Sequence, residues 1–207
     1  DDPLAFRSML DSKGLAVAAL HGGLEQDLDL TLELMDVYGA RDLCISGIGG
    51  WEGTSADRYL EDIEALNGMA RVCAQHDVYL HYHNHAYEFV PTDQGPCGMD
   101  LILSGMDTEV AQLCVDVAWV HIAGQDPAQF LLEHADDVGY VHLKDYEGDR
   151  HWVELGAGVV PLSSVMDALE ELPHVRWVVY EQDTSDSAAA ESCAASHRYL
   201  VDTFGYG

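Results

Sequence analysis

The chain has 207 residues, of which 48% are hydrophobic, and its 37 acidic against 9 basic residues give a formal net charge of −28. A chain of this length can bury one sizeable core, which predicts a single domain over residues 1–207. The negative charge excludes nucleic acid and anionic membranes as partners, because like charges repel. The acidic residues are scattered through segments with periodic apolar residues. This favours a folded protein with an acidic surface, as in proteins of salt-loving organisms, where salt screens the repulsion.

Segments with strand and helix patterns alternate along the chain. Short apolar runs bounded by turns predict six strands, at residues 14–20, 41–46, 78–85, 110–120, 140–145 and 177–183. Apolar residues at helical spacing and capping signals predict six helices, at residues 24–38, 55–76, 100–105, 128–134, 162–172 and 188–204. Six βα units in sequence predict an α/β fold with a parallel sheet covered by helices.

Six strands are two fewer than the eight of a (β/α)₈ barrel. The pattern therefore fits either an open doubly wound sheet or a barrel whose first two βα units are missing from this chain. The turn at residues 47–50 is rich in glycine but lacks the GxGxxG spacing, and there is no Walker A sequence. A dinucleotide or nucleoside triphosphate site is therefore not predicted.

The five cysteines form an odd number and show no CxxC spacing. This predicts reduced thiols and a cytoplasmic protein. No apolar stretch approaches the length of a membrane span, and no signal peptide is visible in the sequence.

Polar side chains gather at the ends of the predicted strands, where parallel α/β folds place their active residues. The segment HYHNHAYEF (81–89) is the densest example. In chain order the candidates are His21, Ser46, His83, Asn84, His85, Asp116, His142, Lys144 and Glu181.

Side-chain alternation along the strands turns Asp116, His142 and Glu181 toward the same side of the sheet. An aspartate, a histidine and a glutamate form a mixed oxygen and nitrogen set that suits Mn²⁺, Mg²⁺, Zn²⁺ or Co²⁺. A lone aspartate at a strand end ordinarily caps a helix or a turn, and we interpret Asp145 and Asp183 in that way. For the other three, one metal site is the better explanation, because a buried charge without a partner is costly.

The chain resembles the sugar phosphate isomerase/epimerase family of xylose isomerase-like TIM barrels. Five segments carry the resemblance in the order the family has them: LHYHNHAYEF (80–89), CVDVAWVHIAGQDPAQFL (114–131), YVHLKDY (140–146), VELGAGVVPLSSVM (153–166) and WVVYEQD (177–183). They span about the C-terminal two-thirds of the chain. The resemblance implies a TIM-barrel-like parallel fold that is incomplete, an N-terminally shortened member lacking the first two βα units.

The resemblance also implies one divalent metal ion held by residues of four consecutive late strands. Asp116, His142 and Glu181 match three of these positions. In many relatives the fourth position is a glutamate, but here it is His83. Either His83 binds the metal through a ring nitrogen, or Glu88 reaches back to it.

The implied chemistry is proton abstraction next to the carbonyl of a sugar substrate, with the metal stabilising the enediolate that forms. Glu181 or Glu88 would move the proton. His85 and Lys144 would bind sugar oxygens or help to transfer protons. Further substrate contacts are expected from His21, His81, Asn84, Trp119 and Glu154, although Trp119 also fits a packing role and Glu154 a solvated loop.

Three alternatives stay open. Expulsion of a β-hydroxyl group after the same proton abstraction would make the protein a dehydratase of inososes or keto sugars. An endonuclease IV-like phosphodiesterase would need a basic groove, which the net charge disfavours. A non-catalytic sugar- or metal-binding relative is the third, because two missing strands expose sheet edges. A complete partner, a homo-oligomer such as a dimer that covers this gap, or an N-terminal segment missing from this chain would each restore the enzyme.

Overall fold

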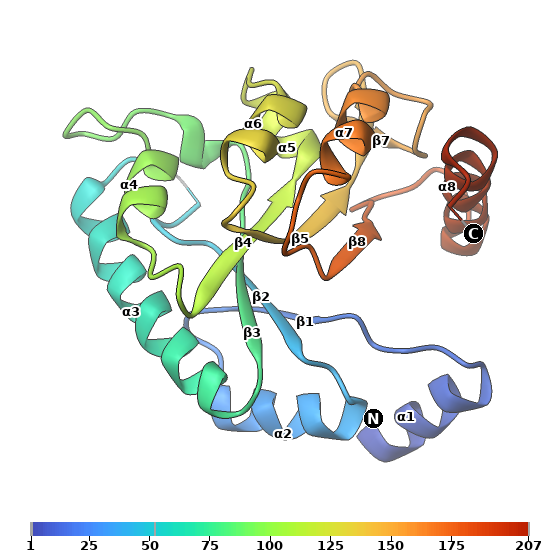
Figure 1. Ribbon diagram of the computed structural model, residues 1–207, viewed down its shortest axis with the longest axis horizontal. Helices are drawn as coiled ribbons and strands as arrows, with labels where there is room; N and C mark the ends of the chain where they lie inside the picture. The colour runs from blue at the N-terminus through green and yellow to red at the C-terminus, as the bar shows by residue number, and fades with distance from the viewer. Residues whose placement is uncertain (1, 52, 207) are drawn as a thin grey trace. The chain divides into compact units, whose positions relative to one another are not determined.

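The computed structural model describes residues 2–51 and 53–206. These residues form two compact units, which are treated separately below. Unit 1 consists of the described residues of Asp1–His83 and Tyr87–Gln112, and unit 2 of those of Asn84–Ala86 and Leu113–Gly207. Each unit contains parallel strands and the helices that connect them (Figure 1), which confirms the predicted α/β class.

Unit 1 contains three parallel strands in the order β1, β2, β3. Their bounds are β1 (Leu20–Gly23), β2 (Asp42–Ser46) and β3 (Tyr79–His83). The helices are α1 (Pro3–Ser12), α2 (Leu28–Tyr38), α3 (Ala56–Gln75), the 3₁₀ turn η1 (Tyr87–Phe89) and α4 (Gly98–Gly105). Helix α3 packs on β3 and α4 (Figure 1), and the side chains of β2 form the centre of this core.

Capping residues set the bounds of the helices in unit 1. Ser55, one of the two predicted caps of α3, accepts the N–H of Arg58. Asp27 caps α2 and starts it at Leu28, four residues later than the predicted start at residue 24. The predicted first strand at 14–20 was also wrong: the residues that pair with β2 are 20–23, so His21 lies inside the strand.

Unit 2 contains the strand β4 (Ala111–Asp116) from Leu113 onward, β5 (Val138–Leu143) and β8 (Trp177–Tyr180), which are parallel and paired in that order. An antiparallel hairpin of β6 (Asp145–Glu147) and β7 (His151–Val153) follows β5. The helices are α5 (Val117–Ile122), α6 (Pro127–Glu133), α7 (Leu162–Leu169) and α8 (Ala189–Phe204). Helix α6 packs against both α5 and α7.

Three predicted strands of unit 2 were too long, and the one predicted at 177–183 ends at Tyr180. The strand predicted at 110–120 ends at Asp116, because the Asp116 carboxylate caps α5 and the chain turns into a helix there. The strand predicted at 140–145 ends at Leu143, and the β6–β7 hairpin that follows was not predicted.

The described residues of both units contain six parallel strands, as the sequence predicted, against eight in a closed (β/α)₈ barrel. Among these residues, no helix combines the length and the apolar character that crossing a membrane requires.

Candidate metal centre

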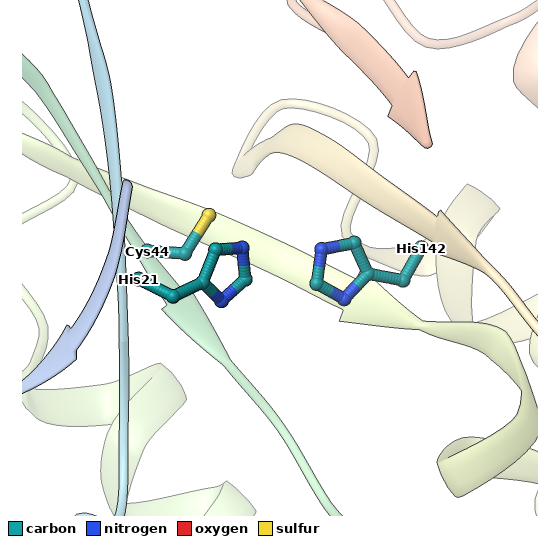
Figure 2. A group of neighbouring side chains, drawn as sticks. All are labelled: His21, Cys44 and His142. Atoms are coloured by element: carbon teal, nitrogen blue, oxygen red, sulfur yellow. The ribbon is translucent and has the colours of Figure 1, made fainter. Parts of the chain in front are cut away.

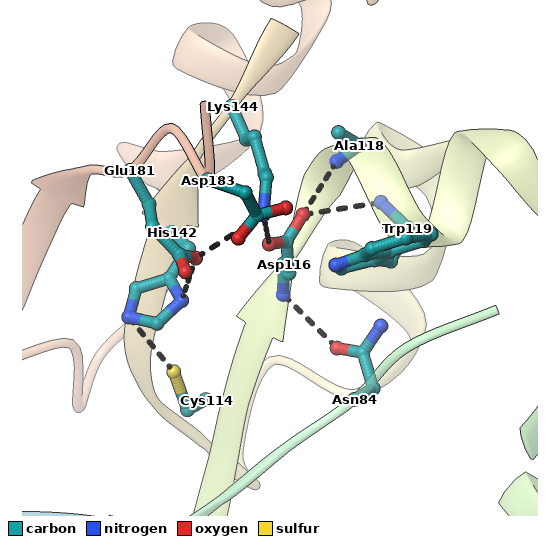
Figure 3. A network of polar contacts seen from close by, with 9 residues as sticks. All are labelled: Asn84, Cys114, Asp116, Ala118, Trp119, His142, Lys144, Glu181 and Asp183. Carbon is teal, nitrogen blue, oxygen red and sulfur yellow. Dashed lines mark hydrogen bonds and ion pairs between the residues drawn. The ribbon is translucent and has the colours of Figure 1, made fainter. Parts of the chain in front are cut away.

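Asp116 stands at the junction of β4 and α5 and is fully buried. Its Oδ1 accepts the N–H groups of Ala118 and Trp119 at 3.0 and 3.1 Å, and its own N–H donates to Asn84 Oδ1 at 2.9 Å (Figure 3). Oδ2 receives no hydrogen bond from the described residues. One oxygen therefore fixes the side chain, and the other is left for a cation.

His142 and Glu181 bring two further ligand atoms to the same place. His142 is buried on β5, and Glu181 directly follows β8, where its N–H donates to the carbonyl of Leu143. The distance from His142 Nδ1 to Glu181 Oε2 is 2.8 Å. Ligand atoms of Asp116, His142 and Glu181 all lie within 4.8 Å of one another, so the structure brings these three predicted ligands together.

Lys144 places a buried ammonium group among the carboxylates. Its Nζ is 2.8 Å from Asp183 Oδ2 and 3.7 Å from both Asp116 Oδ2 and Glu181 Oε2. Interpreting Asp183 as a cap was therefore wrong, because its carboxylate binds Lys144. Three carboxylates against one ammonium leave an excess of two negative charges when all are ionised. A divalent cation would balance this excess, so the residues fit the metal that the resemblance implies.

Burial raises the pKa of Asp116 from 3.8 to about 7, with Glu181 adding to the rise and Lys144 opposing it. The Asp116 anion is thus poorly stabilised by the protein alone, and a bound cation would stabilise it. Burial, followed by the charge of Lys144, lowers the pKa of His85 to about 4. His85 is therefore a neutral imidazole at pH 7, able to donate and accept a hydrogen bond.

Two indole rings and an imidazole form an aromatic wall beside Lys144. Lys144 Nζ lies 4.3 Å from the ring centroid of Trp152 and 5.3 Å from that of Trp119. The two indoles meet edge to face at 5.0 Å, and the ring of His85 is 5.3 Å from that of Trp119. Trp119 lies on α5 and not on a strand. Trp152 was not among the predicted site residues, because the sequence favoured a packing role for it.

Asp145 anchors the segment that follows β5. Its buried carboxylate accepts the N–H groups of Tyr146, Gly156, Gly158 and Val160 at 2.9–3.0 Å. The interpretation of Asp145 as a turn residue is confirmed, and its bonds close the loop that contains β6 and β7. In this loop Glu154 accepts a hydrogen bond from Ser192, which lowers the pKa of Glu154.

The other predicted site residues lie in unit 1. His21 and Cys44 are register partners on the adjacent strands β1 and β2 (Figure 2), and the ring of His21 lies 6.1 Å from that of His83. His81 is buried with its Nε2 2.9 Å from Asp42 Oδ1. Glu88 is buried in η1 and accepts the hydroxyl of Tyr82 at 2.6 Å. The roles predicted for His21, His81, His83 and Glu88 stay predictions.

The family model described as xylose isomerase-like TIM barrel matches residues 5–201. The inosose dehydratase of Geobacillus kaustophilus is 24% identical in an alignment that covers 91% of this chain and 74% of that protein. A sugar phosphate isomerase/epimerase from Parabacteroides distasonis superposes with a TM-score of 0.82 at 16% identity, covering 100% of this chain and 78% of that one. The IOLI protein with a bound zinc atom superposes with a TM-score of 0.76 at 13% identity, covering 98% of this chain and 81% of that one. These likenesses confirm the TIM-barrel-like fold.

Proposed function

The chain belongs to the xylose isomerase-like TIM barrel family, and we propose that it is a divalent-metal-dependent sugar isomerase or epimerase. It would act by removing a proton from the carbon next to a carbonyl group. The observation that carries this proposal is the convergence of ligand atoms from Asp116, His142 and Glu181 within 4.8 Å. The zinc atom bound to the IOLI protein, which has the same fold, supports a metal here.

Asp116 Oδ2, His142 Nδ1 and a Glu181 carboxylate oxygen would hold the metal, with His83 or Glu88 as the predicted fourth ligand. The ion, when bound, would polarise the carbonyl and the vicinal hydroxyl of the sugar and so acidify the neighbouring C–H group. Glu181 is the group that would take the proton, since it is the only one of these three ligands with substantial solvent exposure, at 32% of its side chain.

The remaining residues of the site would orient the sugar. Lys144 would donate hydrogen bonds to its oxygens, and the neutral His85 could exchange a proton with a hydroxyl group. Asn84 Nδ2 is buried and makes no hydrogen bond to the described residues, so it is free to donate to a sugar hydroxyl. Trp119 and Trp152 would pack against the apolar face of the ring.

A dehydratase is the second candidate, and the 24% identity to an inosose dehydratase over 91% of the chain favours it. The first step is the same proton removal by Glu181. The β-hydroxyl group then takes a proton from the Lys144 ammonium group and leaves as water, while Glu181 keeps the proton taken from carbon.

The test is to incubate Mn²⁺-loaded protein with a panel of ketoses and inososes in D₂O and to follow the sugars by NMR. An isomerase or epimerase incorporates deuterium next to the carbonyl and forms an isomer of the same mass apart from the label. A dehydratase forms an unsaturated or rearranged product with one water less. Absence of both reactions with every compound, or reaction rates that a chelator leaves unchanged, would contradict the proposal.

A further inference from the structure

We infer that Cys114 is a positioning residue whose thiol holds the His142 ring with Nδ1 directed at the metal. The inference rests on the proposed metal-dependent function. Cys114 Sγ lies 3.6 Å from His142 Nε2, and both side chains are buried (Figure 3). Strand geometry produces this contact: Cys114 precedes Asp116 by two residues on β4 and so points to the same side, while Asp116 pairs with His142 on β5.

The two nitrogens of the His142 ring have partners of different kinds. Nδ1 is 2.8 Å from Glu181 Oε2, and Nε2 faces the sulfur of Cys114. One of the two neutral tautomers of the ring carries its proton on Nδ1. Nε2 then carries a lone pair, to which the thiol can donate its S–H.

Metal binding requires the other tautomer. A nitrogen that binds a metal must be free of its proton, so the ring proton has to be on Nε2 when Nδ1 is the ligand. A ligating histidine typically donates this second N–H to a neighbouring group, which fixes the ring. The Cys114 sulfur can accept that hydrogen bond after its S–H rotates away, so one thiol serves both tautomers. An alanine at this position would serve neither.

The test compares Co²⁺ binding by calorimetry in the wild-type protein, Cys114→Ala, Cys114→Ser and the control Cys73→Ala. Cys73 is also a buried free cysteine, on α3 of unit 1. Cys114→Ala should weaken Co²⁺ binding about 10–100-fold, the usual effect of removing such a partner. Cys114→Ser should recover most of the loss, because a hydroxyl also donates and accepts, and Cys73→Ala should bind like the wild type.

Spectra of the bound states separate positioning from ligation. In ¹H–¹⁵N spectra of the Zn²⁺-loaded wild type, His142 should carry its proton on Nε2, and Cys114→Ala should broaden or shift this signal. Equal Co²⁺ affinity of Cys114→Ala and wild type, or no recovery in Cys114→Ser, would overturn the inference and leave the proposed function intact. A cobalt–thiolate charge-transfer band that disappears in Cys114→Ala would overturn it by making Cys114 a ligand. Failure of the wild type to bind Co²⁺ would remove the proposed function and this inference together.

Discussion

Lys144 Nζ lies 3.7 Å from Asp116 Oδ2, and both side chains are almost completely shielded from solvent. The ammonium group thus stands beside the carboxylate oxygen that the helix cap leaves free. In the absence of metal, Lys144 is the cation that compensates this buried charge. A bound metal and the Lys144 ammonium would therefore stabilise the same carboxylates.

Replacing Lys144 by Met should destabilise the metal-free protein by about 3 kcal/mol. A buried ion pair that loses one partner leaves an uncompensated charge. The partial exposure of Glu181 and Asp183 keeps the loss of unfolding free energy at the lower end of the range usual for such pairs. Urea unfolding with and without Mn²⁺ measures it. The difference from wild type should shrink at saturating Mn²⁺, because the ion supplies positive charge; an equal loss in both conditions would contradict the shared role.

Replacing Glu181 by Gln should lower turnover by at least about 10²-fold, since the amide cannot take a proton. The rate of deuterium incorporation next to the carbonyl is the measurement. Glu170→Gln at the C-cap of α7 is the matched control, because it removes an exposed carboxylate from the same unit. Retention of the wild-type rate in Glu181→Gln would assign the proton transfer to another residue.

The raised pKa of Asp116 predicts that the metal-free protein loses stability as the pH rises. The carboxyl group has a pKa of 3.8 when unfolded and about 7 when folded, so between these values the folded state binds more protons. The contribution of this carboxyl group to the free energy of unfolding is fully present below pH 3.8 and is lost as the pH rises through 7. Asp116→Asn keeps a cap for α5 but cannot ionise. The free energy of unfolding of wild type minus that of Asp116→Asn should therefore fall from pH 4 to pH 8, and a constant difference would argue against the shift.

His85 should remain neutral well below the ordinary histidine range, since burial lowers its pKa from 6.5 to about 4. Its contribution to stability is present above pH 6.5 and is lost as the pH falls toward 4, because the unfolded state then binds the proton more readily. NMR titration of the ring proton, assigned with His85→Gln, follows this ionisation directly. A midpoint near 6.5 would mean that the ring is not shielded by its burial next to Lys144.

Asp145→Asn should loosen the loop of residues 146–160 while the strands stay folded. The amide nitrogen would face two of the N–H groups that the carboxylate now accepts, which costs about 1–3 kcal/mol. Hydrogen exchange should accelerate at Gly156, Gly158 and Val160. Asp149→Asn at the exposed hairpin tip serves as the control. Unchanged exchange at the three amides would show that the loop does not depend on Asp145.

The sequence carried the α/β class because the strands are short apolar runs between amphipathic helices, and this pattern is local. It also pointed to Asp116, His142 and Glu181, since parallel strands present their C-terminal residues at one edge. Local patterns could not reveal the β6–β7 hairpin, whose register pairs Tyr146 with Trp152 through contacts that the sequence does not display. The sequence also did not show that Asp116 caps α5, a role that is visible only in its hydrogen bonds.

The most direct measurement of the central claim is a crystal structure of the Mn²⁺-soaked protein with anomalous data collected at the manganese edge. The proposed site predicts one strong anomalous peak, about 2.0–2.6 Å from Asp116 Oδ2, His142 Nδ1 and a Glu181 carboxylate oxygen. The same crystal structure would also show whether His83 or Glu88 is the fourth ligand. An anomalous peak bound by other residues, or no peak at a Mn²⁺ concentration that supports turnover, would contradict the metal centre described above.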